Sequence, residues 1–281
     1  MVVQPQWETS LMHHRHTEPL WVRRTLIAVS VGFVGVLILL PVVAVFTEAF
    51  RRGVGLYFSS ITDPLALAAL RLTLLTAGIT LAFNLVFGLA ASWLIAKFNF
   101  PGRNLLLSLI DLPFAVSPVI SGLIFVLLFG AQGWFGKSGV QIVFATPGVI
   151  LATIFVTFPF IARELIPLMQ QQGTEEEEAA VLLGANGWQI FRRVTLPNIR
   201  WALLYGVVLA NARAMGEFGA VSVVSGHIRG RTNTLPLHVE ILYNEYNFAA
   251  AFAVASLLAL LALITLIAKA IIERKIQTGE R

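Results

Sequence analysis

Six apolar stretches, each long enough to cross a membrane, are the feature of this sequence that most restricts its fold. A helix needs about 20 consecutive apolar residues to span the roughly 30 Å hydrocarbon core of a bilayer. Apolar residues make up 57% of the 281-residue chain and charged residues only 12%, which lies outside the range of soluble domains. We therefore expect an all-α integral membrane protein. The six expected transmembrane helices run near 25–46, 66–96, 104–130, 141–161, 201–224 and 249–271.

Lysine and arginine are distributed unequally between the two ends of these spans. The end that carries both termini has thirteen: Arg15, Arg23, Arg24, Lys97, Arg103, Arg163, Arg192, Arg193, Arg200, Lys269, Arg274, Lys275 and Arg281. The opposite end has five: Arg51, Arg52, Lys137, Arg229 and Arg231. Because basic residues favour cytoplasmic loops, both termini are expected in the cytoplasm. The basic residues form no separate patch, so binding of nucleic acid is not expected.

The spans divide the chain into a cytoplasmic tail over 1–24, a membrane domain over 25–272 and a second cytoplasmic tail over 273–281. The membrane domain includes a cytoplasmic loop over 162–200. His13, His14 and His16 lie in the first tail, where a short free segment is poorly suited to fix a metal, and we expect no metal site. The chain has no cysteine, which excludes disulfides and thiolate metal sites.

The cytoplasmic loop contains the most polar long stretch of the chain, EEEEAAVLLGANGWQIFRRVTLP. Thr174 and Glu177 have the spacing of a capping box, so a helix is expected to begin at Thr174. Gly184 is suited to a left-handed helix end, and Asn186-Gly187 indicates a turn. A second short helix should follow and stop before Pro197. The pattern predicts a helix–turn–helix elbow.

This elbow should expose small or apolar side chains to the cytoplasm, at Ala179, Ala180, Leu182 and Leu183. Two interpretations remain open on these residues alone. Another protein docks there, or the elbow lies on the bilayer as an amphipathic segment. Four consecutive glutamates, Glu175 to Glu178, weigh against an anionic lipid surface.

The elbow also resembles the EAA motif of ABC importer permeases. The match consists of Glu178-Ala179-Ala180, Gly184 after three residues, and Val194-Thr195-Leu196-Pro197, with valine where isoleucine is usual. The resemblance implies a type I importer permease fold and a helix that sits in a cleft of a cytoplasmic ATPase. The residues implied in ATPase coupling are Glu178, Ala179, Ala180, Leu183, Gly184, Trp188, Arg192, Arg193, Leu196 and Pro197.

Further stretches resemble the sulfate/thiosulfate branch of these permeases, which is similar to the molybdate permeases. They include FPGR from 100, DLPFA from 111, FPF from 158 and RAMGEFGA from 213. Details after 198 are closer to the W-type subunit than to its T-type sister. The resemblance implies an inner-membrane subunit whose partners are a T-type permease, a dimer of ATP-binding subunits and a periplasmic sulfate/thiosulfate-binding protein.

Residues 131–138, AQGWFGKS, fit a relaxed phosphate-loop pattern, but such a loop needs a preceding strand and a following helix in an α/β domain. The chain is therefore expected to bind no cofactor and to catalyse no reaction, with ATP and Mg²⁺ held by the partner ATPase. A membrane enzyme is disfavoured because the spans contain no nucleophile–base constellation. Two alternatives are kept: a molybdate or tungstate permease, and a stand-alone secondary anion transporter, which would need inverted repeats.

Polar and helix-breaking residues inside the spans are candidates for the anion path or its gate. Arg213 and Glu217 have the spacing of an ion pair, which would neutralise the arginine; otherwise Arg213 lines the path. A helix restarting after Pro118 would offer amide donors to an oxyanion, or Pro118 marks a simple kink. Asp111 would suit a gate or a contact with Arg103. The complete candidate set is Asp111, Pro113, Ser117, Pro118, Ser121, Arg213 and Glu217.

Overall fold

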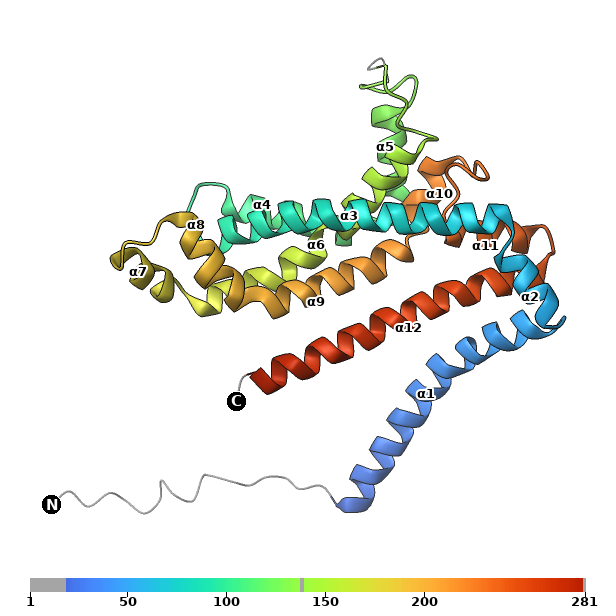
Figure 1. The fold of residues 1–281 in the computed structure, drawn as a ribbon, viewed down its shortest axis with the longest axis horizontal. Helices are drawn as coiled ribbons and strands as arrows, with labels where there is room; N and C mark the ends of the chain where they lie inside the picture. The colour runs from blue at the N-terminus through green and yellow to red at the C-terminus, as the bar shows by residue number, and fades with distance from the viewer. Residues whose placement is uncertain (1–18, 137–138, 280–281) are drawn as a thin grey trace. The chain divides into compact units, whose positions relative to one another are not determined.

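The structure is a computed structural model that describes residues 19–136 and 139–279, and every regular element in those residues is a helix (Figure 1). The three histidines of the first tail lie outside the described residues. The chain divides into one unit ending at Ala44 and a second from Val45 onward. The helices are α1 Leu20–Phe50, α2 Val54–Ile61, α3 Pro64–Lys97, α4 Arg103–Ala115, α5 Pro118–Phe129, α6 Thr146–Gln172, α7 Glu175–Leu182, α8 Gly187–Ile190, the π-helical turn η1 Phe191–Thr195, α9 Leu196–Met215, α10 Gly219–Ser225, α11 Leu235–Asn244 and α12 Phe248–Gly279.

The first unit contains most of α1, which is apolar on all sides. Its most hydrophobic window has no residue buried within the structure. A helix with apolar side chains around its whole circumference is stable only in apolar surroundings, such as lipid or other helices. This agrees with the expected first span, although the helix begins earlier and ends later than residues 25–46.

The centre of the second unit is formed by α3, α6 and α9, which run side by side in Figure 1. Small residues allow the close approach of their backbones, as is usual between membrane helices. A Cβ atom added at Gly88 of α3 would lie 3.2 Å from the Ile161 side chain, and one at Gly206 of α9 would lie 3.2 Å from Ile161 Cα. The core around this contact contains Ile161, Leu165, Met169, Ile199 and Ala210.

Two of the six expected spans are bent pairs of helices. In the described part of the chain, four single helices are long and apolar enough to cross a membrane, and the number rises to six when each bent pair counts as one span. The expected span 104–130 is α4 and α5, with a bend of 109° between them, and the expected span 201–224 lies in α9 and α10, with a bend of 50° between them. Val116 and Ser117 are extended between α4 and α5, as Pro118 requires of the residue before it.

The other differences from the expected spans lie at helix ends. α6 begins at Thr146 rather than 141 and continues to Gln172, well into the segment that was assigned to the cytoplasmic loop. α12 extends to Gly279, into the stretch assigned to the second tail. Between α10 and α12 the chain folds back as the short helix α11, whose Leu235 N–H donates to Thr73 Oγ1 of α3 at 2.8 Å.

Candidate functional site: the elbow at 174–198 and the bent-helix cavity

The elbow comprises residues 174–198 and begins with α7, whose first turn consists of four glutamates. Negative side chains are favourable there because the N-terminal end of a helix carries partial positive charge. α7 begins where the sequence predicts, but the predicted capping box is wrong. The Thr174 hydroxyl donates to Glu178 Oε1 at 2.6 Å, and Glu177 accepts instead from the Thr195 hydroxyl at 2.7 Å.

The turn of the elbow depends on Gly184, as predicted. Its φ of +83° is a left-handed conformation that favours glycine. Around it the Ala185 N–H donates to the Ala180 carbonyl at 3.0 Å, which closes the end of α7. A capping box that the sequence analysis missed follows directly, because Asn186 and Gln189 exchange hydrogen bonds of 2.9 Å. The Asn-x-x-Gln spacing is the sequence pattern that could have predicted this capping box.

The second arm of the elbow does not stop before Pro197, so that prediction is wrong. α8 passes into the π-helical turn η1, in which the Leu196 N–H bonds the Phe191 carbonyl, and then directly into α9. This turn resets the hydrogen-bond pattern, and Pro197 falls in the first turn of α9, where its missing N–H costs no helical bond. The elbow is therefore continuous with a membrane helix.

The outer side of the elbow is apolar. Leu182 and Leu183 are 89% and 88% exposed, and Val181 and Trp188 are exposed as well. Beside them lies a groove of about 400 Å³, lined by Ala180, Leu183, Gly184, Ala185, Gln189, Ile190, Arg193 and Val194. An apolar projection next to a groove with a basic rim suits contact with another protein.

An aromatic stack connects this outer side to the membrane helices. Exposed Trp188 stacks on Phe191 at 5.6 Å between ring centroids, and Phe191 stacks on Trp93 of α3 at 5.1 Å. Of the other residues predicted for coupling, Glu178, Ala179, Arg192, Arg193 and Pro197 are exposed, while Ala180 and Leu196 are half-buried. The structure thus brings the whole predicted set onto one elbow.

The second candidate region is a cavity of about 240 Å³ where α4 bends into α5, and we call it the bent-helix cavity. It brings together four of the predicted path residues, Pro113, Ser117, Pro118 and Arg213. The remaining wall consists of Phe114, Ala115, Val116, Val156 and Phe160. Ser121 lies one turn further along α5, buried, with its hydroxyl donating to the Ser117 carbonyl at 3.2 Å.

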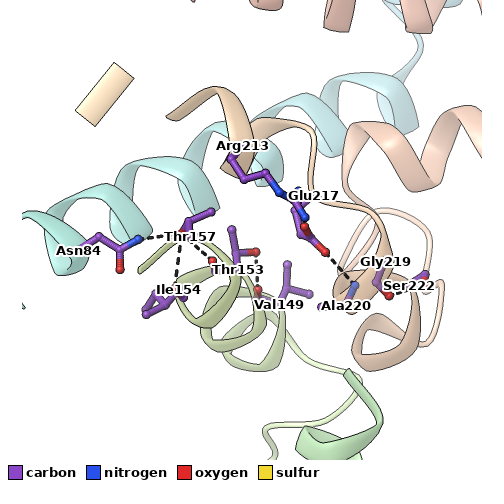
Figure 2. A network of polar contacts seen from close by, with 10 residues as sticks. All are labelled: Asn84, Val149, Thr153, Ile154, Thr157, Arg213, Glu217, Gly219, Ala220 and Ser222. Carbon is purple, nitrogen blue, oxygen red and sulfur yellow. Dashed lines mark hydrogen bonds and ion pairs between the residues drawn. The ribbon is translucent and has the colours of Figure 1, made fainter. Parts of the chain in front are cut away.

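Arg213 and Glu217 form the predicted ion pair, at 2.5 Å between Nη1 and Oε2, and Figure 2 shows their side chains turned toward each other. They do not share a helix, because α9 ends at Met215 and Glu217 lies in the break before α10. The buried Glu217 also accepts from the Ala220 N–H at 2.8 Å. One carboxylate therefore neutralises the arginine and holds the start of α10.

The two bends pack directly on each other. A Cβ atom added at Gly219 would lie 2.8 Å from Pro118 Cβ, and one at Gly122 would lie 2.7 Å from the Ala220 carbonyl. The start of α5 is therefore covered on one side by α10, and this close contact explains Gly219 and Gly122. Only a residue without a side chain fits at Gly219 and Gly122 without displacement.

Asp111 lies outside the cavity wall. Its Oδ1 is 3.4 Å from Arg163 Nε, and the Arg163 guanidinium lies over the Phe114 ring at 4.8 Å. The suggested contact with Arg103 is not formed, since Arg103 Nε donates to the Ile95 carbonyl at 2.8 Å. Asp111 thus ties α4 to α6 at the edge of the cavity.

Further polar contacts that sequence reasoning missed join distant parts of the chain. Asn84 Nδ2 of α3 donates to Thr157 Oγ1 of α6 at 2.7 Å, deep in the core (Figure 2). At the elbow, Lys97 Nζ lies 3.1 Å from Glu177 Oε2. Lys97 and Glu177 are 80 positions apart in the sequence (177 − 97), so no local pattern indicates their pairing.

Residues 84–278 match the family described as binding-protein-dependent transport system inner membrane component. The sulfate transport system permease protein CysW of Escherichia coli (strain K12) is 51% identical over 265 residues, covering 93% of this chain and 91% of the relative. The CysW protein of Synechocystis sp. is 54% identical over 258 residues, covering 90% and 94%. The CysT protein of Escherichia coli (strain K12) is 37% identical over 233 residues, covering 82% and 84%.

A bacterial ABC transporter involved in the import of the acidic polysaccharide alginate contains a chain with the same fold. The two chains superpose with a TM-score of 0.75 at 18% identity, and the match covers 90% of this chain and 96% of that chain. The fold is therefore that of an importer permease. The chain belongs to the family of binding-protein-dependent transport system inner membrane components, in its branch of CysW sulfate permeases.

Proposed function

We propose that this chain is the W-type permease subunit of an ATP-driven sulfate/thiosulfate importer in the bacterial inner membrane. The identity of 51% to 54% with CysW proteins along most of the chain carries the proposal. Its partners in this account are a T-type permease, a dimer of ATP-binding subunits and a periplasmic sulfate/thiosulfate-binding protein. The permease itself binds no cofactor, and ATP and Mg²⁺ are held by the ATPase.

The elbow is the proposed docking site for the ATPase. Its exposed Leu182, Leu183 and Trp188 would enter a cleft of the ATP-binding subunit, while Arg192 and Arg193 contact the rim. This interpretation places the elbow and both termini in the cytoplasm, as the distribution of basic residues predicts. Closure of the ATPase dimer on ATP would then move the elbow and shift the membrane helices between inward-open and outward-open states.

The bent-helix cavity is the proposed section of the anion path in this subunit. Because Glu217 neutralises Arg213, the wall offers an anion no net charge, only the Ser117 hydroxyl and backbone groups near the start of α5. Weak holding of this kind favours release after each cycle. The choice among sulfate, thiosulfate and molybdate would then depend mainly on the periplasmic binding protein.

The proposed function is tested by reconstituting this chain in liposomes with its T-type permease, ATPase and sulfate-binding protein. We expect uptake of labelled sulfate only when ATP is enclosed with the ATPase, and competition by thiosulfate. Uptake by the permease chain alone under an ion gradient would contradict the proposal and support a secondary transporter. Competition by molybdate, with no competition by thiosulfate, would reassign the substrate.

A further inference from the structure

Lys97 is the last residue of α3. Its side chain is nearly inaccessible to solvent, although α3 ends here at a membrane boundary. The side chain is 7% exposed, and that of its partner Glu177 is 17% exposed. Nζ lies 3.1 Å from Glu177 Oε2 and also donates to the carbonyl of Gly173, the cap residue directly after α6. One ammonium group thus joins the end of α3, the end of α6 and the start of α7.

Glu177 is held from a third direction. Its second oxygen, Oε1, accepts from the Thr195 hydroxyl of η1 at 2.7 Å, and Thr195 is buried. The gap enclosed by these side chains is about 10 Å³, room for about one water molecule. Bulk solvent therefore screens the Lys97–Glu177 pair weakly. Ordinary surface ion pairs differ, because solvent and salt screen them and they contribute little to stability.

The position of this pair matters because α3, unlike α6 and α9, is not directly joined to the elbow along the chain. The chain joins α7 to α6 through Gly173 and joins η1 directly to α9, so both of those helices must follow any movement of the elbow. α3 follows only through noncovalent contacts. α3 packs along α6 and α9, and its direct contacts with the elbow include the Lys97–Glu177 pair and the stack of Trp93 on Phe191, which reaches the exposed Trp188.

We propose that Lys97 is a positioning residue that makes α3 follow the elbow, so that closure of the ATPase moves α3 together with α6 and α9. This inference depends on the proposed docking of the ATPase on the elbow. Glu177 then acts inside the permease, as the ion-pair partner of Lys97. The glutamate run of α7 serves mainly to fasten the elbow, since Glu176 also accepts from Asn198 and Glu178 from Thr174.

The test uses the complete reconstituted importer and the variants Lys97→Met, Lys97→Arg and the double variant Lys97→Met/Glu177→Gln. The double variant leaves no unpaired buried charge, so a loss of function in it reports the missing connection rather than simple desolvation. Glu175→Gln is the matched control, because Glu175 lies on the same turn of α7 and is exposed. Three quantities are measured: the ATPase that co-purifies, ATP hydrolysis, and sulfate transported per ATP.

We expect both Met variants to retain the ATPase and its hydrolysis while sulfate transported per ATP falls about 5- to 150-fold, the usual range of coupling between sites. Lys97→Arg and Glu175→Gln should keep the wild-type ratio. A wild-type value of sulfate transported per ATP in the double variant would contradict the proposed role of Lys97, but not the docking of the ATPase on the elbow. Failure of the ATPase to co-purify with the wild-type chain would overturn the docking proposal, and this inference with it.

Discussion

The elbow and the bent-helix cavity obtain their shapes in different ways. The elbow is fixed by side chains from distant parts of the chain, with Lys97, Glu177 and Thr195 meeting around a gap of about 10 Å³. The bent-helix cavity is shaped by backbone sterics, with Pro118 opposite Gly219 and a single ion pair behind them. The elbow thus has the Lys97–Glu177 pair at its joint with α3 and exposes Leu182, Leu183 and Trp188, whereas the cavity neutralises its one arginine.

Under the proposed function, the elbow would bind a protein partner firmly, whereas the cavity would hold an anion only weakly. A surface that binds a protein partner gains from exposed Leu182, Leu183 and Trp188. A wall along an anion path gains from weak, uncharged contacts, because a strongly held anion would not leave. Substitutions in the cavity should therefore disturb the permease itself, while substitutions on the outer side of the elbow should disturb its assembly with a partner.

The largest effect is expected at the ion pair of the cavity. Glu217→Ala leaves Arg213 without its carboxylate and removes the acceptor of the Ala220 N–H, which we expect to cost about 3 kcal/mol. The measurement is thermal unfolding of the detergent-solubilised permease. Arg213→Met combined with Glu217→Met should recover much of the loss, since it leaves no unpaired charge, and an equally unstable double variant would show that the pair is not the cause.

A smaller effect is expected where the two bends touch. Gly219→Ala places a methyl group 2.8 Å from Pro118 Cβ, and forcing an extra carbon into a packed contact costs about 1–3 kcal/mol. Sulfate uptake and thermal stability should fall together, while the ATPase still co-purifies. Gly78→Ala is the control, because its added carbon would have nothing within 4 Å. Equal effects at both glycines would argue against the close contact.

At the elbow, Gly184→Val should have the opposite effect to Gly219→Ala: the permease should lose the ATPase but keep its folded membrane domain. A branched residue at φ +83° is strained by about 1–2 kcal/mol, and the turn that orients α7 is lost. Co-purification of the ATPase should fall sharply while the membrane domain remains folded. Gly187→Ala, at the first residue of α8, should have little effect on co-purification. Undiminished co-purification with the Gly184 variant would contradict the elbow as docking site.

The smallest effect is expected from the aromatic stack. Trp188→Ala removes the exposed end of the stack on Phe191, which is also one of the side chains proposed to enter the cleft of the ATPase, and an aromatic contact of this kind is worth about 0.5–1.5 kcal/mol. The affinity of the ATPase for the permease should fall by about three- to tenfold, measured by titration in detergent. Trp134→Ala is the control on an exposed tryptophan outside the elbow. A loss of affinity with Trp134→Ala alone would place the ATPase elsewhere.

The sequence predicted the break before α5 and the elbow better than the contacts that hold them, and it missed the bend between α9 and α10. Pro118 and the Gly184 turn are local backbone constraints, so they are visible in a few consecutive residues. The continuation of the helix through Pro197 was missed because a π-helical turn has no simple local signature. The Lys97–Glu177 pair was missed because it depends on the packing of α3 against the elbow, and Lys97 was interpreted only as a cytoplasmic charge.

The central claim is that the apolar side of the elbow contacts the ATPase, and a cysteine crosslink tests it most directly. The chain contains no cysteine, so Leu182→Cys and Tyr246→Cys each introduce one exposed thiol, at the elbow and just after α11. A photoactivatable thiol reagent on each variant is activated in membranes that contain the whole importer. If the elbow contacts the ATPase, an adduct with the ATP-binding subunit forms from position 182 and none from 246. An ATPase adduct from position 246, with none from 182, would contradict this claim.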